Sequence, residues 1–185
     1  MLETAIEFLR YFIVLLFGAL VAVDLAGMRR TRKNYLVFGC FVILLFTLQV
    51  ICLMTWGMAV TTKVYPLLSH LPVVVFILLY LKRSLLISLA SMFVSFLCCQ
   101  FPRWIGSAAG SVSDSVTMNH IGFIAAAIVM YYFLQKYVLK SAQHLMERSV
   151  KSCLLFAAVP AFYYLYDHIA FVYTDFMYSG TRAAL

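Results

Sequence analysis

The stretch NYLVFGCFVILLFTLQVICLMTWGMAVTT, residues 34–62, decides the fold because it contains no aspartate, glutamate, lysine or arginine. A helix needs about 20 apolar residues to cross the ~30 Å hydrocarbon layer of a bilayer. The backbone finds no water in that layer, so a crossing segment must be a helix or a strand of a closed barrel. Strands of a membrane barrel alternate polar and apolar residues, and this stretch does not alternate. It therefore predicts a transmembrane helix.

The rest of the chain has the same character. Of its 185 residues, 65% are hydrophobic and 11% are charged, and residues 84–102 and 115–135 also lack the four charged types. We expect an all-α polytopic membrane bundle of about six transmembrane helices, forming one domain over residues 1–185. The predicted spans cover residues 8–27, 35–59, 64–81, 84–104, 118–138 and 153–173. The segments VTTK (60–63) and GSAAGSVSDSVT (106–117) are expected to be loops between spans.

The positions of the basic residues predict how the bundle is oriented, because lysine and arginine concentrate in cytoplasmic connections. Ten of the fourteen basic residues lie in three alternate connections: Arg29, Arg30, Arg32, Lys33, Lys82, Arg83, Lys136, Lys140, Arg148 and Lys151. The other four are Arg10, Lys63, Arg103 and Arg182. We therefore expect these three connections to be cytoplasmic and both termini to be extracellular.

Several classes of chemistry have no support in the sequence. The net charge of +7 fits the topology and anionic headgroups, and nothing indicates nucleic-acid binding. The chain has no P-loop and no HExxH motif, so we predict no catalytic residue, no cofactor and no metal. Its five cysteines lack CxxC or metal-ligand spacing, and we interpret them as small apolar residues: Cys40, Cys52, Cys98, Cys99 and Cys153.

The stretch YYLYDHIAFVYTD, residues 163–175, places ionisable groups inside the last predicted span. Spacings of three and four residues put one set on a single helical stripe: Tyr164, Asp167, His168, Phe171 and Asp175. Ionisable residues within a bilayer usually face the bundle interior or a water-filled cavity and pair with one another. Near the start of the chain, Glu7 and Arg10 are also three residues apart and able to pair.

On the predicted topology, most polar residues within the spans fall in the outer half of the bilayer. We therefore predict an outward-facing ligand site formed by Arg10, His70, Gln100, Arg103, Tyr164, Asp167 and His168. An alternative stays open, in which these residues hold helices together or extend to the headgroups.

Three stretches carry a resemblance to a known family: YPLLSHLPVVVFILLYLKR (65–83), LCCQFPRWIG (97–106) and YLYDHIAFVYTDFMYSG (164–180). They resemble the membrane input region of sensor histidine kinases of Gram-positive bacteria that carry a GHKL-type ATP-binding domain. Those kinases are distantly similar to quorum-sensing peptide receptors. The resemblance implies an extracellular ligand and a homodimer in the intact receptor. It also implies a further span, a phosphoacceptor histidine and an ATPase beyond this chain.

Three functional hypotheses follow. The first is a sensor module that binds an extracellular small molecule or peptide and signals to a cytoplasmic histidine kinase. The second is a small six-span transporter or substrate-capture subunit, which the length and span count fit about equally well. The third and weakest is a cytoplasmic cysteine protease that pairs His144 with Cys153.

Overall fold

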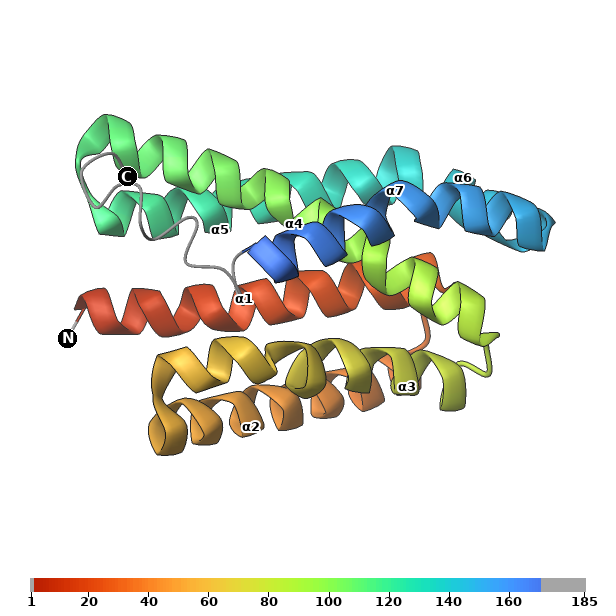
Figure 1. The fold of residues 1–185 in the computed structure, drawn as a ribbon, viewed down its shortest axis with the longest axis horizontal. Coiled ribbons are helices and arrows are strands. Elements are labelled where there is room, and N and C mark those ends of the chain that lie inside the picture. Colours follow the sequence, from red (N-terminus) through yellow and green to blue (C-terminus); the bar gives the residue numbers. More distant parts are fainter. Residues whose placement is uncertain (1, 171–185) are drawn as a thin grey trace.

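The computed structural model describes residues 2–170, which are almost entirely helical and contain no strand (Figure 1). In chain order the elements are α1 (Leu2–Leu25), α2 (Arg32–Tyr65), the π-helix η1 (Pro66–His70), α3 (Leu71–Leu79), α4 (Leu85–Ser113), α5 (Val116–Phe133), the π-helix η2 (Leu134–Val138), α6 (Leu139–Arg148) and α7 (Val150–His168). The predicted all-α class is confirmed for the described residues.

Four segments among the described helices are long and apolar enough to cross a membrane by length and composition: Ile6–Leu25, Arg32–Gly57, Leu85–Ser113 and Val116–Arg148. The apolar helix Lys63–Leu79, which overlaps the third predicted span, is shorter. The last predicted span begins within α7, and its final residues, 171–173, lie outside the described part of the chain. A helical membrane protein is therefore supported, while the count of six crossings stays a prediction.

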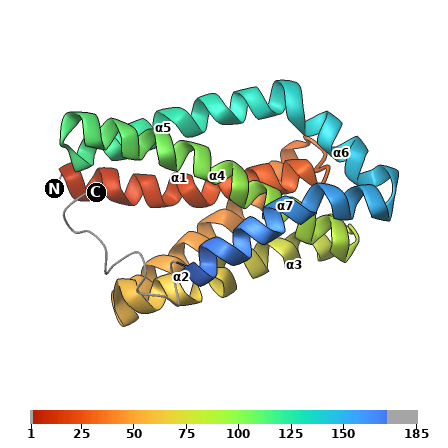
Figure 2. The same cartoon turned by 45° about the horizontal axis from the view of Figure 1, so that its top comes forward.

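Helix α1 lies at the centre of the bundle, between the layer of α2 and α3 and the layer of α4 and α5 (Figures 1 and 2). Val21, Ala22 and Val23 have no exposed surface. A helix that is apolar on every side lies in a protein core or spans a membrane, and at these residues the protein itself covers α1. One core cluster joins α1 to α4, α5, α6 and α7, and a second joins α1 to α2 and α3.

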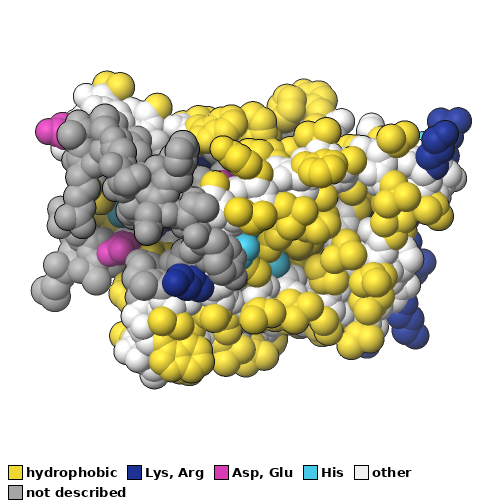
Figure 3. Space-filling model, viewed as in Figure 1, with side chains coloured by type: hydrophobic (Ala, Val, Ile, Leu, Met, Phe, Trp, Pro, Cys, Tyr) yellow, Lys and Arg dark blue, Asp and Glu magenta, His cyan; other side chains and the backbone are white. Residues whose placement is uncertain are grey.

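The basic connections lie together at one end of the bundle. The turns between α1 and α2, α3 and α4, and α6 and α7 lie at the end opposite the N-terminus (Figure 1). Many dark blue lysine and arginine side chains appear at that end in the space-filling view (Figure 3). The fold thus groups the three connections as the predicted topology requires. Which face of a membrane this end meets stays a prediction, and Arg182 lies outside the described residues.

The predicted loop at residues 60–63 is wrong, because the chain reverses direction earlier, at Gly57. This glycine has φ 77° and ψ 175°, a conformation that is essentially restricted to glycine. The helix resumes after it and runs to Tyr65, and the Thr61 hydroxyl donates to the Gly57 carbonyl oxygen at 2.7 Å. A glycine backbone, and not the polar VTTK segment, makes the turn.

The long loop predicted at residues 106–117 is also wrong, because α4 continues through Ser113. Asp114, with a left-handed φ of 48°, and Ser115, which caps α5, are all that separate the two helices. The glycines have a packing role: a Cβ on Gly106 would lie 2.7 Å from the Asn119 carbonyl oxygen. Small residues allow transmembrane helices to approach closely, so the apparent linker is the contact between α4 and α5.

A π-helical turn, η1, separates the end of α2 from α3. Pro72 follows it, and a proline has no N–H to donate to the carbonyl four residues earlier. Such turns often occur at functional sites. Here the turn carries Ser69, which is 1% exposed, and His70 into the interior of the bundle.

Candidate functional site

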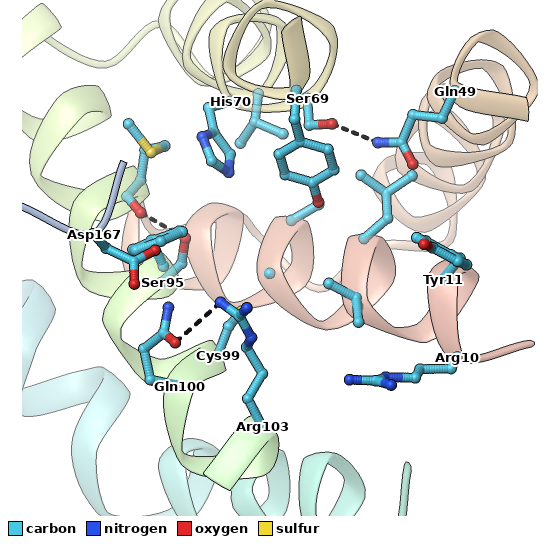
Figure 4. Close-up of a pocket in the computed structure, with 18 of the residues that line it drawn as sticks. Arg10, Tyr11, Gln49, Ser69, His70, Ser95, Cys99, Gln100, Arg103 and Asp167 are labelled. Atoms are coloured by element: carbon cyan, nitrogen blue, oxygen red, sulfur yellow. Dashed lines mark hydrogen bonds between the residues drawn. The ribbon is translucent and has the colours of Figure 1, made fainter. Parts of the chain in front are cut away.

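A cavity of about 450 Å³ lies between α1, α4, η1 and the end of α7, with further residues from α2, α3 and α5 (Figure 4). We call it the polar cavity. Its volume falls within the ~300–1,000 Å³ that is usual for small-molecule sites. Six of the seven residues predicted to bind a ligand line it: Arg10, His70, Gln100, Arg103, Asp167 and His168.

The seventh predicted residue, Tyr164, contacts the site through His70. Its hydroxyl lies 2.9 Å from His70 Nδ1. The fold therefore brings the predicted residues together although they extend from position 10 to position 168. The other two members of the predicted stripe, Phe171 and Asp175, lie outside the described residues. That the assembled residues bind a ligand stays a prediction.

Aromatic contacts around His70 connect η1 to α4 and α7. The His70 ring lies 5.6 Å from the Phe96 ring and 5.3 Å from the Tyr164 ring, centroid to centroid. Tyr164 stacks on His168 with an interplanar angle of 2° and a centroid distance of 6.0 Å. Contacts of this kind position helices. For His70 and Tyr164, the structure agrees with the alternative role of holding helices together.

Two arginines line the polar cavity, together with the carboxylates of Glu7 and Asp167. Arg10 Nη1 donates to His120 Nδ1 at 2.8 Å, and its guanidinium carbon lies 5.4 Å from the centre of the Phe123 ring. Arg103 Nη1 donates to Gln100 Oε1 at 3.2 Å. Among the described side chains, neither arginine forms an ion pair. Both guanidinium groups thus have donors left for a further partner.

The pairing expected between Glu7 and Arg10 does not form among the described side chains, because Arg10 contacts His120 on α5 instead. Sequence analysis missed His120 as a cavity residue. The signal available was weak: a single histidine in the uncharged run 115–135. Spacing on one helix did not indicate that α5 would place this ring beside α1.

Gln100 presents the clearest unmet hydrogen-bonding capacity in the polar cavity. Its side chain is 3% exposed, and its Nε2 has no hydrogen-bond partner within the described part of the chain. Gln49, also buried at the cavity, donates from its amide to the Ser69 hydroxyl (Figure 4). A buried donor without a partner costs about 1–3 kcal/mol. A ligand acceptor placed beside Gln100 would recover that cost.

The remaining wall of the polar cavity is largely apolar. Val14 and Leu15 come from α1, Val73 from α3, and Met92 and Phe96 from α4. An apolar wall with a few convergent polar groups is typical of a binding site for a small organic molecule. Among the residues described, no group of three or more histidine, cysteine, aspartate and glutamate side chains is placed to hold a metal ion.

The protease hypothesis receives no support from the position of Cys153. This side chain is 1% exposed and belongs to the core cluster around α1, while His144 is exposed on α6. A nucleophilic thiol must reach its substrate, and Cys153 is enclosed by core side chains. Cys52 and Cys99 are also buried, as expected for cysteines that act as small apolar residues.

No protein-family model, curated protein or solved structure matches this chain.

Proposed function

We propose that this chain is the membrane-embedded input region of a two-component sensor histidine kinase. In this proposal six helices cross the membrane, both termini are extracellular, and the basic connections lie in the cytosol. The polar cavity binds an extracellular small molecule or peptide. The intact receptor acts as a homodimer and passes the signal to a cytoplasmic kinase domain.

One observation carries the proposal: a cavity of ligand size contains a buried donor without a partner and two arginines without ion pairs among the described residues. Gln100 Nε2, Arg10 and Arg103 all line this cavity. Together they suit a ligand with an amide or carboxylate oxygen, because each supplies only N–H donors at the free position. The apolar wall suits the rest of a small amphiphile or peptide.

The positions of the cavity residues on different helices also suggest how ligand binding would produce a signal. Arg10, Gln100 and Asp167 belong to α1, α4 and α7, so a ligand touching all three would change how these helices pack. A ligand shifts such an equilibrium only when it binds one arrangement more tightly than the other. The unpaired Gln100 donor supplies that difference if the ligand reaches it in one arrangement alone.

Binding is tested with three probes of equal chain length: decanoate, decanamide and decyltrimethylammonium. The full chain is reconstituted in lipid nanodiscs and its thermal unfolding is followed with each probe. We expect decanoate and decanamide to raise the melting temperature more than decyltrimethylammonium, because only they carry an acceptor. The difference should disappear in Gln100→Leu and Arg103→Gln variants. Equal shifts for all three probes, unchanged by the variants, would contradict binding at this site.

Signalling is tested separately by joining the chain, through one added span, to a histidine kinase module. A probe that binds the polar cavity should change the rate of autophosphorylation in vesicles. The transporter alternative is favoured by the same cavity, and it makes a different prediction. Vesicles containing the chain would then accumulate the radiolabelled probe, and autophosphorylation of the fusion would not respond.

A further inference from the structure

A second cavity, of about 590 Å³, lies at the basic end of the bundle. We call it the basic cavity. Its walls come from two parts of the chain that are distant in sequence: the end of α1 with the α1–α2 connection, and the stretch from the last turn of α5 through η2 into α6. Gln143 on α6 donates to the Asp24 carbonyl oxygen, which fastens these two parts together.

Four cations line the basic cavity: Arg29, Arg30, Lys136 and Lys140. The only acidic group among its described lining residues is Asp24, which is 4% exposed. Its carboxylate accepts from the Tyr131 hydroxyl at 2.8 Å and lies 3.8 Å from Arg30. The carboxylate is thus already occupied, and the cavity keeps an excess of positive charge that matches an anion.

Concentration of basic residues at a cytoplasmic end does not by itself explain this cavity. Other basic residues at the same end, such as Lys33 and Lys151, do not line it. Those that line it converge from both parts of the chain, and the side-chain amides of Gln135 and Gln143 lie beside them. Convergent guanidinium and ammonium donors match a phosphate group.

The outer face of α5 favours a lipid as the source of that phosphate. Ile128, Val129, Tyr132 and Lys136 follow spacings of one, three and four residues and share one face, and the first three are more than half exposed. The Lys136 ammonium lies 5.9 Å from the centre of the Tyr132 ring and 5.2 Å from that of Tyr137. Tyrosine rings are typical of the membrane interface, with apolar residues toward the bilayer core.

We propose that the basic cavity binds the phosphate-bearing headgroup of an anionic phospholipid, with its acyl chains along the exposed face of α5. Basic pockets between transmembrane helices on the cytoplasmic side bind such headgroups. The bound lipid would join the end of α1 to α6 without any contribution from the polar cavity. The site therefore shares only the predicted orientation of the bundle with the proposed sensor function.

The test titrates dioctanoyl-phosphatidylglycerol into the full chain in a neutral maltoside detergent and measures Kd by calorimetry. A Lys136→Gln/Lys140→Gln variant should bind about thirtyfold more weakly, from about 1 kcal/mol per basic residue. The matched control, Lys33→Gln/Lys151→Gln, removes the same charge from the same end outside the cavity and should change Kd less than threefold. Equal weakening by the two variants would overturn the site in favour of general surface attraction.

Two further probes distinguish the source of the phosphate. Dioctanoyl-phosphatidylcholine should bind at least tenfold more weakly, and equal binding would overturn recognition of an anionic headgroup. Glycerol phosphate should bind far more weakly than the lipid, and equal binding would assign the site to free phosphate and overturn the lipid. If the double lysine variant does not fold, Arg29→Gln, at an exposed cavity residue, should still weaken binding about fivefold. An unchanged Kd there would overturn the proposal.

Discussion

Gln49 and Gln100 are both buried and both line the polar cavity, but their amides differ in what they contact. The Gln49 amide donates to Ser69, whose side chain is 1% exposed, whereas Gln100 Nε2 has no partner within residues 2–170. Burial alone does not separate a structural polar residue from one suited to a ligand. The state of each hydrogen bond does.

The two glutamines should therefore respond differently to the same substitution. Gln49→Leu removes one hydrogen bond to the buried Ser69 hydroxyl, which also bonds to Tyr65, and should lower the free energy of unfolding by about 0.5–1.5 kcal/mol. Gln100→Leu removes an unsatisfied donor and also the Oε1 acceptor of Arg103, so the two effects oppose each other and the free energy of unfolding should stay nearly unchanged. Detergent-induced unfolding followed by circular dichroism measures both. A loss in Gln100→Leu as large as in Gln49→Leu would show that the Gln100 amide has a structural role.

The sequence was most informative about individual residues whose side chains are costly to place in a membrane. Arginine, histidine, aspartate and glutamine are rare in bilayer spans, so their presence identified six residues that now line one cavity. Partners were less predictable. Arg10 contacts His120 on α5 and not Glu7 three residues away, because the rotation of each helix is set by packing across the bundle.

Helices α4 and α5 approach each other closely at glycine residues. The same glycines led the sequence analysis to predict a loop where α4 continues. Glycine and serine in residues 106–113 have low helix propensity, so local preference indicated a linker. Tertiary packing overrides that preference, since Gly106 lies against Asn119 and Phe123 of α5. The long apolar runs, by contrast, predicted helices correctly within residues 2–170 because their hydrophobicity leaves no other backbone state.

Gly106→Ala should destabilise the bundle, because its Cβ would lie 2.7 Å from the Asn119 carbonyl oxygen and 3.0 Å from Phe123 Cβ. Overpacking of this kind costs about 1–3 kcal/mol. Gly39→Ala on α2 is the matched control, since nothing lies within 4 Å of its Cβ. That variant should be neutral or slightly stabilising in the same unfolding measurement. Equal effects of the two substitutions would contradict a close α4–α5 contact.

Gly57 tests a different property of the backbone. Like Gly39 it has room for a side chain, since a Cβ there would meet nothing within 4 Å, but its φ is 77°. Gly57→Ala should therefore cost about 1–3 kcal/mol through backbone strain alone. Thermal unfolding beside Gly39→Ala measures the difference. Equal stability of the two variants would mean that the chain does not reverse at this residue.

The central helix α1 lines two cavities, the polar cavity near its start and the basic cavity near its end. Arg10, near its start, lines the polar cavity, and Asp24, near its end, lines the basic cavity. The proposed orientation accounts for both, because it would place the basic cavity in the cytosol beside anionic lipid and the polar cavity toward the exterior. The functional assignments of both cavities therefore depend on which way the bundle is inserted.

Cysteine labelling in intact cells tests that orientation directly. In a variant lacking the native cysteines, Val112→Cys lies near the end of α4, where the native side chain is 91% exposed. It should react with an impermeant maleimide. Lys33→Cys and Lys140→Cys, at the basic end, should react only after the membrane is permeabilised, because basic connections are retained in the cytosol. Labelling of either position in intact cells would mean that the bundle is inserted in the opposite direction. The polar cavity would then face the cytosol, and an extracellular ligand would no longer explain its unpaired donors.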